Sequence, residues 1–457
     1  VSALQAGAQY IAELIEYTPA PGQLINMSPW GTPAGARSIE GDINGSLSLG
    51  AFGGYVVFRF EHPVENDPQN PYGVDFTIFG NPMPDWSEPG VVWVMKDENE
   101  NGEPDDTWYE LAGSDHWFSN TMENYRVSYL NPGGTAATDI PWEDHMGNQG
   151  TIRANSIYTQ TYYPFYDSFP HIDSLSYELE GTLLEGMVFE HSTGIRSVRR
   201  TFGYADNQLR GSEPFTVPDN PYTRDIENSG GDAFDIGWAV DTGGHYVELD
   251  RIHFIKVQSA LLADGGRLGE VSTELTGAVD VIPDPAISGE RTMVVIKDLP
   301  QRLKGHEYQL EFMVFQDGRL DPEGSVNWST SHAAASVDED HVLRVSEEGV
   351  LSVTAALSGR PEIQATVSTT VRFTQTHAEG ALVNGPLLYP NPTSGKFRMR
   401  IQEGNSVRLY NAAGELLMQV DDYQRGKVLD ITSFPAGIYP VQIARGNSLQ
   451  WIKLLKL

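Results

Sequence analysis

Short apolar or alternating segments, separated by turn residues, recur through most of this 457-residue chain. From Leu47 onward they include YVVFRF, DFTIFG, VVWVM and TWYEL, which are rich in β-branched and aromatic residues. Clusters of Gly, Pro, Asn and Asp stand between them, a spacing typical of β-sandwiches and jelly rolls. One stretch, Ala3–Tyr17, places apolar residues at helical spacing, so we expect a helix there and an all-β fold in the rest of the chain.

The chain is longer than one hydrophobic core usually organises, so we expect three domains. Residues 1–283 are expected to form a calcium-stabilised β-sandwich of jelly-roll type that carries the ligand site. Residues 284–375 have the strand-like segments and the tryptophan of an immunoglobulin-like module. A linker at 376–386 leads to a small β-sandwich at 387–457, where Pro and Gly turns break short strands.

The 62 acidic and 30 basic residues give a formal net charge of −32 at neutral pH. This charge argues against nucleic acids and anionic membranes as partners, because both are polyanionic. The sequence contains no cysteine, which excludes disulfide bonds and thiolate-ligated metals. No segment approaches the roughly 18 consecutive apolar residues of a membrane span, so we expect none.

The stretch Asp97–Asp106, DENENGEPDD, places six carboxylates in ten positions. It opens as a calcium loop does, with short oxygen side chains at alternate positions and a glycine, Gly102, for the sharp turn. The predicted ligands are Asp97, Asn99, Asn101, Asp105 and Asp106, with the backbone carbonyl of Glu103. Trp108 stands where an EF-hand has its bidentate Glu, and the segments on both sides of the loop have the composition of strands. We therefore expect a calcium loop between two strands.

In its D-x-N-x-N-G-x-P-D-D form, this loop resembles the calcium repeats of the thrombospondin type 3 and dockerin families, with one copy present. The resemblance implies calcium as the cofactor and carries no enzymatic meaning. A metal-free polar hairpin is the alternative, because turns select the same residues. Repulsion among the carboxylates favours the cation.

A second group of acidic residues lies among apolar neighbours that are expected to bury it: Asp75, Glu88, Asp232 and Asp235. A buried, unpaired carboxylate is costly, so each needs a cation, an arginine or backbone donors. Metal binding and structural hydrogen bonding both satisfy this requirement. The sequence alone leaves the two alternatives open.

Most tryptophans of residues 1–283 stand at strand positions, where packing in the core is the expected role. Trp86 and Trp142 differ, since both lie in polar, proline-containing segments whose sequence is typical of loops. An indole exposed in a loop suits a sugar ring or a large planar ligand. We therefore expect these two residues to contact a ligand.

A search for nucleophile, zinc-protease and phosphate-loop motifs finds none in the sequence. Carboxylate pairs are expected by chance among so many acidic residues, so they indicate a glycosidase only with the right geometry. The prediction is accordingly a binding protein. A surface hydrolase acting on glycans and a structural adhesin are the alternatives.

Residues Leu387–Leu457 contain LYPNPTSGKFRMRI, SVRLYNAAGELL, VLDITSFPAGIYPVQI and a closing WIKLLKL, in that order. They resemble the type A C-terminal sorting domain of the type IX secretion system of Bacteroidetes. The resemblance implies export across the outer membrane, with the type IX translocon and the surface attachment machinery as partners. Pro440 cannot donate to a strand ladder, so we expect its strand to lie at a sheet edge.

The first domain resembles uncharacterised Bacteroidetes surface proteins that carry FGGYVVFRF, YGVDFTIFGN, SEPGVVWV, DDTWYELAGSDH and GGDAFDIGWAVD in this order. Some such surface proteins capture ligands for outer-membrane transporters, including those for corrinoids. This resemblance implies an extracellular ligand, either a corrinoid or a glycan, and a transporter as a possible partner. The residues themselves do not distinguish the two ligands.

Overall fold

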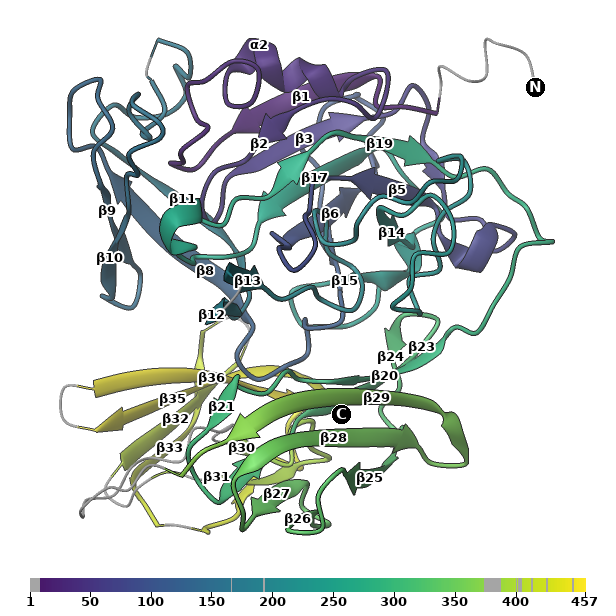
Figure 1. Cartoon of the computed structure of the whole chain (residues 1–457), viewed down its shortest axis with the longest axis vertical. Helices are drawn as coiled ribbons and strands as arrows, with labels where there is room; N and C mark the ends of the chain where they lie inside the picture. The colour runs from purple at the N-terminus through teal and green to yellow at the C-terminus, as the bar shows by residue number, and fades with distance from the viewer. Residues whose placement is uncertain are drawn as a thin grey trace. The chain divides into compact units, whose positions relative to one another are not determined.

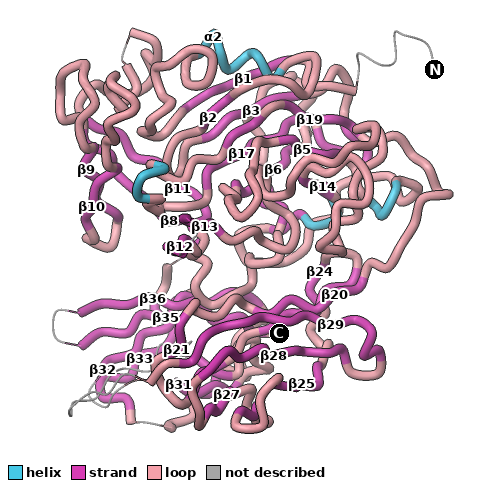
Figure 2. The backbone as a smooth tube through the Cα atoms, viewed as in Figure 1, coloured by secondary structure: helices cyan, strands magenta, loops and turns pink. Residues whose placement is uncertain are grey.

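The computed structural model describes residues 9–165, 167–191, 194–373, 388–399, 401, 405–411, 414–424, 426–445 and 448–457. The described chain is almost entirely β, which confirms the predicted fold class (Figures 1 and 2). It divides into two compact units. Unit 1 comprises residues 1–114, 122–241 and 246–290, and unit 2 comprises 115–121, 242–245 and 291–457. The predicted linker at 376–386 lies outside the described residues.

A six-stranded antiparallel sheet, in the order β1-β3-β17-β6-β7-β15, is the largest of unit 1. Its strands are β1 (Glu13–Thr18), β3 (Tyr55–Arg59), β17 (Phe254–Ser259), β6 (Gly90–Met95), β7 (Trp108–Leu111) and β15 (Ala239–Val240). Strands β3, β6 and β17 are buried along most of their length, which explains their continuous Val, Ile and Phe content.

The helix expected over Ala3–Tyr17 is wrong in its described part, because Glu13–Thr18 forms β1 and pairs with β3. A bulge between Leu14 and Glu16 interrupts the alternation of this strand. Leu14 and Tyr17 therefore both point into the core, three residues apart. Apolar residues three apart also mark one face of a helix, which is why the sequence predicted a helix here.

Smaller sheets complete unit 1. A four-stranded sheet contains β10 (Gln149–Ile152), β9 (Ile140–Asp144), β8 (Met122–Leu130) and β11 (Ser176–Leu183), and a three-stranded sheet contains β14 (Asp232–Phe234), β5 (Phe76–Phe79) and β19 (Gly277–Asp280). Three pairs follow: β12 (Val188–His191) with β13 (Gly194–Ser197), β16 (Arg251–Ile252) with β4 (Val64–Glu65), and β18 (Glu274–Leu275) with β2 (Leu47–Ser48). The helical turns are α2 (Pro33–Ala36), η1 (Arg37–Ile39), η2 (Pro71–Gly73), η3 (Ile236–Trp238) and η4 (Gly266–Leu268).

The immunoglobulin-like part of unit 2 has three small sheets around one apolar core. They are β20 (Thr292–Ile296), β23 (Phe312–Gln316) and β24 (Arg319–Leu320); β21 (Arg302–Leu303), β29 (Arg360–Val371), β28 (Gly349–Leu357) and β25 (Val326–Thr330); and β22 (Glu307–Gln309), β27 (Val342–Val345) and β26 (Ala335–Val337). Trp328, the tryptophan of this module, is half-buried at the margin of the core and donates its indole N–H to His341 Nδ1 at 3.0 Å.

The C-terminal part of unit 2 is a small two-sheet module with its own core. Its strands are β30 (Leu388–Tyr389), β31 (Lys396–Met399) and β34 (Leu429–Asp430), then β33 (Leu416–Tyr423), β32 (Asn405–Tyr410), β35 (Gly437–Arg445) and β36 (Ser448–Lys456). The edge position expected for the strand of Pro440 is wrong, because β35 lies between β32 and β36. Pairing with β32 ends at Val441, so Pro440 stands just past the end of that ladder. No helix among the described residues is long and apolar enough to cross a membrane.

Candidate functional site

The acidic loop Asp97–Asp106 joins β6 to β7, which pair as a hairpin and end in register at Met95 and Trp108. The expected position between two strands is therefore confirmed. Asp97 is buried at the base of the loop, with 8% exposure. Its Oδ2 accepts the N–H of Gly102 at 2.8 Å and its Oδ1 accepts that of Asn101 at 3.1 Å. This carboxylate holds the loop closed.

Among the remaining predicted ligands, the side chains of Asn99, Asn101 and Asp105 contact one another, whereas Asp106 bonds the backbone near the start of the loop. Asn99 Oδ1 accepts the N–H of Asn101 at 2.9 Å, and Asn101 Oδ1 accepts that of Glu103 at 2.8 Å. The side-chain amides of Asn99 and Asn101 donate to Asp105 at 3.2 and 3.1 Å. Asp106 Oδ2 accepts the N–H of Glu98 at 2.9 Å.

The donor set of this loop fits a calcium ion. Asn99, Asn101 and Asp105 bring their polar ends together, and an amide oxygen that already accepts a backbone N–H keeps a second lone pair for a cation. Asp97 and Asp105 add carboxylate oxygens, the hard ligands that calcium prefers. Gly102 has φ +77°, the left-handed conformation that the sharp turn of such a loop needs. Asp97 and Gly102 also line a cleft of about 670 Å³ that contains Arg59 and His253.

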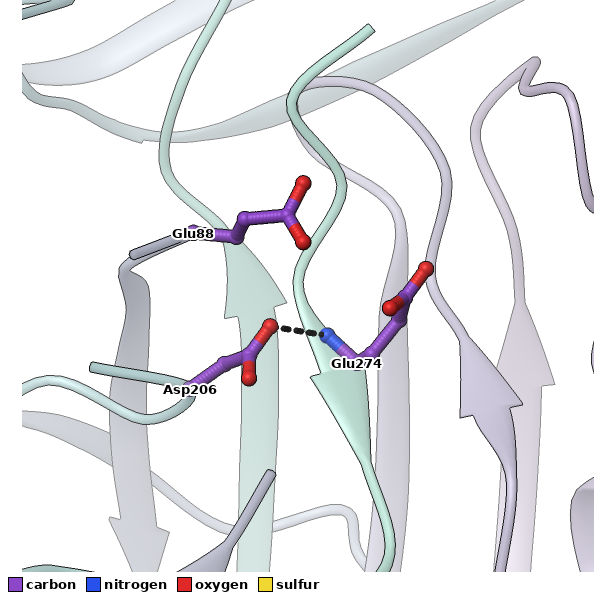
Figure 3. Close-up of side chains that lie close together, drawn as sticks. All are labelled: Glu88, Asp206 and Glu274. Carbon is purple, nitrogen blue, oxygen red and sulfur yellow. Dashed lines mark hydrogen bonds between the residues drawn. The ribbon is translucent and has the colours of Figure 1, made fainter. Parts of the chain in front are cut away.

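Glu88, Asp206 and Glu274 form a second acidic group in unit 1 (Figure 3). One carboxylate oxygen of each lies within 4.8 Å of the others. Asp206 accepts the N–H of Asn81 at 2.9 Å and that of Glu274 at 2.8 Å, and Glu88 accepts that of Ser272 at 3.0 Å. Backbone donors thus satisfy part of the Asp206 and Glu88 carboxylates, and the side-chain amide of Asn81 donates to Glu274 at 2.7 Å.

Electrostatics in this trio oppose full ionisation. Burial raises the pKa of Glu88 well above its usual value, and the charges of Glu274 and Asp206 add to the effect. Burial and the charge of Glu274 also raise the pKa of Asp206 well above its usual value. Burial also raises the pKa of Glu274 to about 7. The trio therefore requires either shared protons or a cation at neutral pH.

The acidic residues that the sequence grouped together occupy three separate places. Glu88 belongs to the trio, whereas Asp75 lies near Asp235, whose charge adds to the effect of burial in raising the pKa of Asp75. Asp75 accepts the N–H of Ile236 at 2.8 Å. Asp235 caps η3 by accepting the N–H of Gly237 at 2.6 Å. These two carboxylates hold backbone in place.

Asp232 occupies the third place, on β14. It accepts the N–H of Asn207 at 3.0 Å and that of Gln208 at 2.8 Å. Burial raises its pKa to about 8, although these bonds oppose the shift. Asp232 therefore anchors the segment that carries Asp206.

Trp86 is not the exposed contact that its loop-like sequence predicted. It is 5% exposed and packs with Val91, Tyr204 and Leu261 in an apolar cluster. The loop folds back through paired backbone hydrogen bonds between Met83 and Trp86, which turn the indole inward. Its side chain hydrogen-bonds to the Glu88 carboxylate, so its role is structural.

Trp142 is half-buried and lies on β9, not in a loop. It pairs with Gly150 on β10, where a Cβ would stand 2.3 Å from the indole Cζ2. The indole therefore packs across the glycine backbone. Trp142 also lines a cleft of about 280 Å³ with Arg153, Asp264 and Glu270.

Sequence reasoning missed Asp206, Glu274 and Glu270. Asp206 and Glu274 come from distant parts of the chain, and no local spacing signals that they meet Glu88. Glu274 stands on the short strand β18, and nothing in its local sequence signals a site. Asp206 has φ 56°, a conformation that the sequence does not reveal.

Residues 387–456 match the model of the secretion system C-terminal sorting domain. The chain carries a type IX C-terminal sorting domain. This confirms the family resemblance of residues 387–457, and the match covers the C-terminal module of unit 2. The sorting domain indicates export across the outer membrane to the cell surface or extracellular space, with handling by the type IX machinery.

No curated protein matches this chain in sequence. Among solved structures, the chain is similar to the Escherichia coli adhesin FdeC, with 14% identity, 46% of this chain and 78% of that chain covered, and a TM-score of 0.15. Domains 3–5 of Drosophila OTK share 10% identity over 84% of this chain and 97% of theirs, with a TM-score of 0.15. Immunoglobulin domains 1–5 of Sidekick-1 share 10% identity over 84% of this chain and 76% of theirs, with a TM-score of 0.14.

Proposed function

We propose that this secreted surface protein captures an extracellular ligand through unit 1, which a calcium ion at Asp97–Asp106 stabilises. The observation that carries the proposal is the pair of clefts on unit 1, one beside the acidic loop and one beside Trp142. The acidic loop closes the β6–β7 hairpin, and β6 lies inside the six-stranded sheet. A cation there would therefore stabilise the six-stranded sheet, whose strands β1, β3 and β17 line the cleft beside the acidic loop.

Thermal unfolding of the full chain against a panel of oligosaccharides, cobalamins and haem tests ligand capture. A ligand that binds only the folded state stabilises it by about 2.7 kcal/mol at 100 times its Kd. We expect at least one class to raise the Tm. If no class raises it at millimolar concentration, the capture function is wrong.

A second candidate, hydrolysis of a glycan, is favoured by one observation. Asp264 and Glu270 both line the Trp142 cleft, and burial raises the pKa of Glu270 to about 7, in the range that suits a general acid. Counting reducing ends after incubation with oligosaccharides separates the two functions. Capture predicts no new ends, whereas hydrolysis predicts new ends that disappear in Glu270→Gln.

A further inference from the structure

The cleft beside Trp142, here called the Trp142 cleft, is built from two parts of unit 1. The β9–β10 hairpin supplies Trp142, Thr151 and Arg153. The segment 262–270 supplies the facing wall with Asp264 and Glu270. Its volume of about 280 Å³ lies just below the roughly 300–1,000 Å³ range of small-molecule sites, so it suits a compact ligand.

Glu270 gives this cleft a buried acceptor with unused capacity. The residue is 4% exposed, and its Oε1 accepts the N–H of Gln23 at 2.7 Å. Its Oε2 is buried and has no hydrogen-bond partner among the described residues. Oε2 has essentially no accessible surface, and a buried acceptor without a donor is costly, so a ligand hydroxyl that displaces the atoms covering Oε2 would gain a hydrogen bond there.

The rim of the cleft carries both a donor and an acceptor. Arg153 Nε lies 3.0 Å from Asp264 Oδ2, and the Arg153 side chain is 70% exposed. Asp264 Oδ1 also accepts the N–H of Gly266 at 2.7 Å, which fixes the carboxylate. A ligand can therefore hydrogen-bond to a guanidinium and a carboxylate at the same time.

The indole supplies the apolar surface of the site. Gly150 leaves room for the ring to lie against the backbone of β10, and any side chain there would displace it. An aromatic face beside hydrogen-bonding groups suits a ligand with an apolar face and polar edges. A pyranose ring has this character, with C–H groups on its faces and hydroxyls around its edge.

We propose that the Trp142 cleft binds a neutral sugar ring, which stacks on Trp142 while its hydroxyls reach Glu270, Asp264 and Arg153. This inference rests on the proposed capture function and names its ligand class. An amine ligand would gain from the carboxylates but would be repelled by Arg153. A corrinoid macrocycle is too large for the cleft.

Calorimetric titration of the full chain with a panel of neutral mono- and disaccharides tests the inference. We expect saturable binding that weakens about tenfold or more in Trp142→Ala, since one aromatic contact is lost. Trp451→Ala is the matched control, because Trp451 is also half-buried and packs against one aromatic ring, Tyr410, in the sorting domain. It should bind as the wild type does.

Glu270→Gln tests the buried acceptor. Its amide oxygen must accept the N–H of Gln23, so a donor replaces Oε2 and a ligand hydroxyl loses its acceptor. We expect weaker sugar binding with little change in the calcium titration. Arg153→Gln, at an exposed position, provides a second variant that should fold normally and also bind more weakly.

The results separate this inference from the proposed function. Sugar binding that Trp142→Ala and Glu270→Gln leave unchanged would overturn the site. Absence of sugar binding, while a cobalamin or haem still raises the Tm, would overturn the ligand class and leave capture intact. If no ligand of any class binds, capture itself fails.

Discussion

Asp97 Oδ2 accepts the backbone N–H of Gly102 at 2.8 Å, and this bond closes the acidic loop between β6 and β7. The bond requires Gly102 to adopt a positive φ, which L-residues with a side chain adopt at a cost. Asp97 is buried, whereas most of the loop is exposed. The loop is therefore held at one buried carboxylate and one glycine.

Gly102→Ala should lower the free energy of unfolding by about 1 kcal/mol and weaken calcium binding, because the left-handed conformation becomes strained. No atom would clash with the new Cβ, since the nearest, Arg59 Nη1, is 3.9 Å away. Urea unfolding and calcium titration measure the two effects. Gly133→Ala is the matched control, with φ +82° and open space, and it should lose stability without losing calcium affinity. Equal calcium affinities in the two variants would contradict the account.

Trp86→Ala should destabilise the protein by about 3–5 kcal/mol, because it leaves a cavity in a buried cluster. Sugar affinity measured at a temperature where the variant is folded should fall less than in Trp142→Ala, since Trp86 packs behind the segment 262–270 but does not itself line the Trp142 cleft. A small loss of stability together with a large loss of affinity would restore the ligand-contact role that we have rejected.

Asp232→Asn should flatten the pH dependence of stability. Burial raises the pKa of Asp232 from 3.8 to about 8, so between these values the folded state binds a proton that the unfolded state has released. The contribution of this group to stability therefore falls as pH rises from about 4 to about 8. The variant lacks that slope, although it also loses one acceptor for the N–H groups of Asn207 and Gln208. Urea unfolding across this range measures how the unfolding free energy of the wild type and of Asp232→Asn changes with pH. Equal pH dependences in the two proteins would show that Asp232 does not titrate as described.

A chain that ends at Gln375 lacks the sorting domain and should accumulate in the periplasm of the native host. Protease shaving of intact cells, followed by immunoblotting, measures the surface fraction. The full chain is the control and should be degraded by the protease. Normal surface display of the truncated chain would contradict a sorting role for residues 387–456.

The sequence predicted those elements whose signal is local. VVWVM and TWYEL became β6 and β7 because β-branched and aromatic residues fit a buried sheet. The bulge at Leu14 could not be predicted from the sequence, since it depends on how β1 pairs with β3. The interior position of Pro440 depends on the order of strands in the sheet, which spacing along the chain does not encode.

The candidate sites divide in the same way. The acidic loop is contiguous, so its converging side chains could be predicted from their spacing. The sequence predicted a ligand contact at Trp142 but did not indicate Glu270, which lines the same cleft, because the segment 262–270 approaches β9 only in the folded chain. Trp86 was misassigned because its polar neighbours suggested exposure, whereas backbone pairing with Met83 buries it.

Differential scanning calorimetry of the full chain, in calcium and in chelator, tests the central claim of a calcium-stabilised surface domain most directly. For the wild type we predict a higher Tm in calcium, since a cation that binds only the folded loop stabilises it by mass action. Asp97→Ala should have a lower Tm than the wild type in calcium and show the same Tm in both conditions. Equal melting temperatures for the wild type with and without calcium would contradict the claim and leave the loop as a metal-free hairpin.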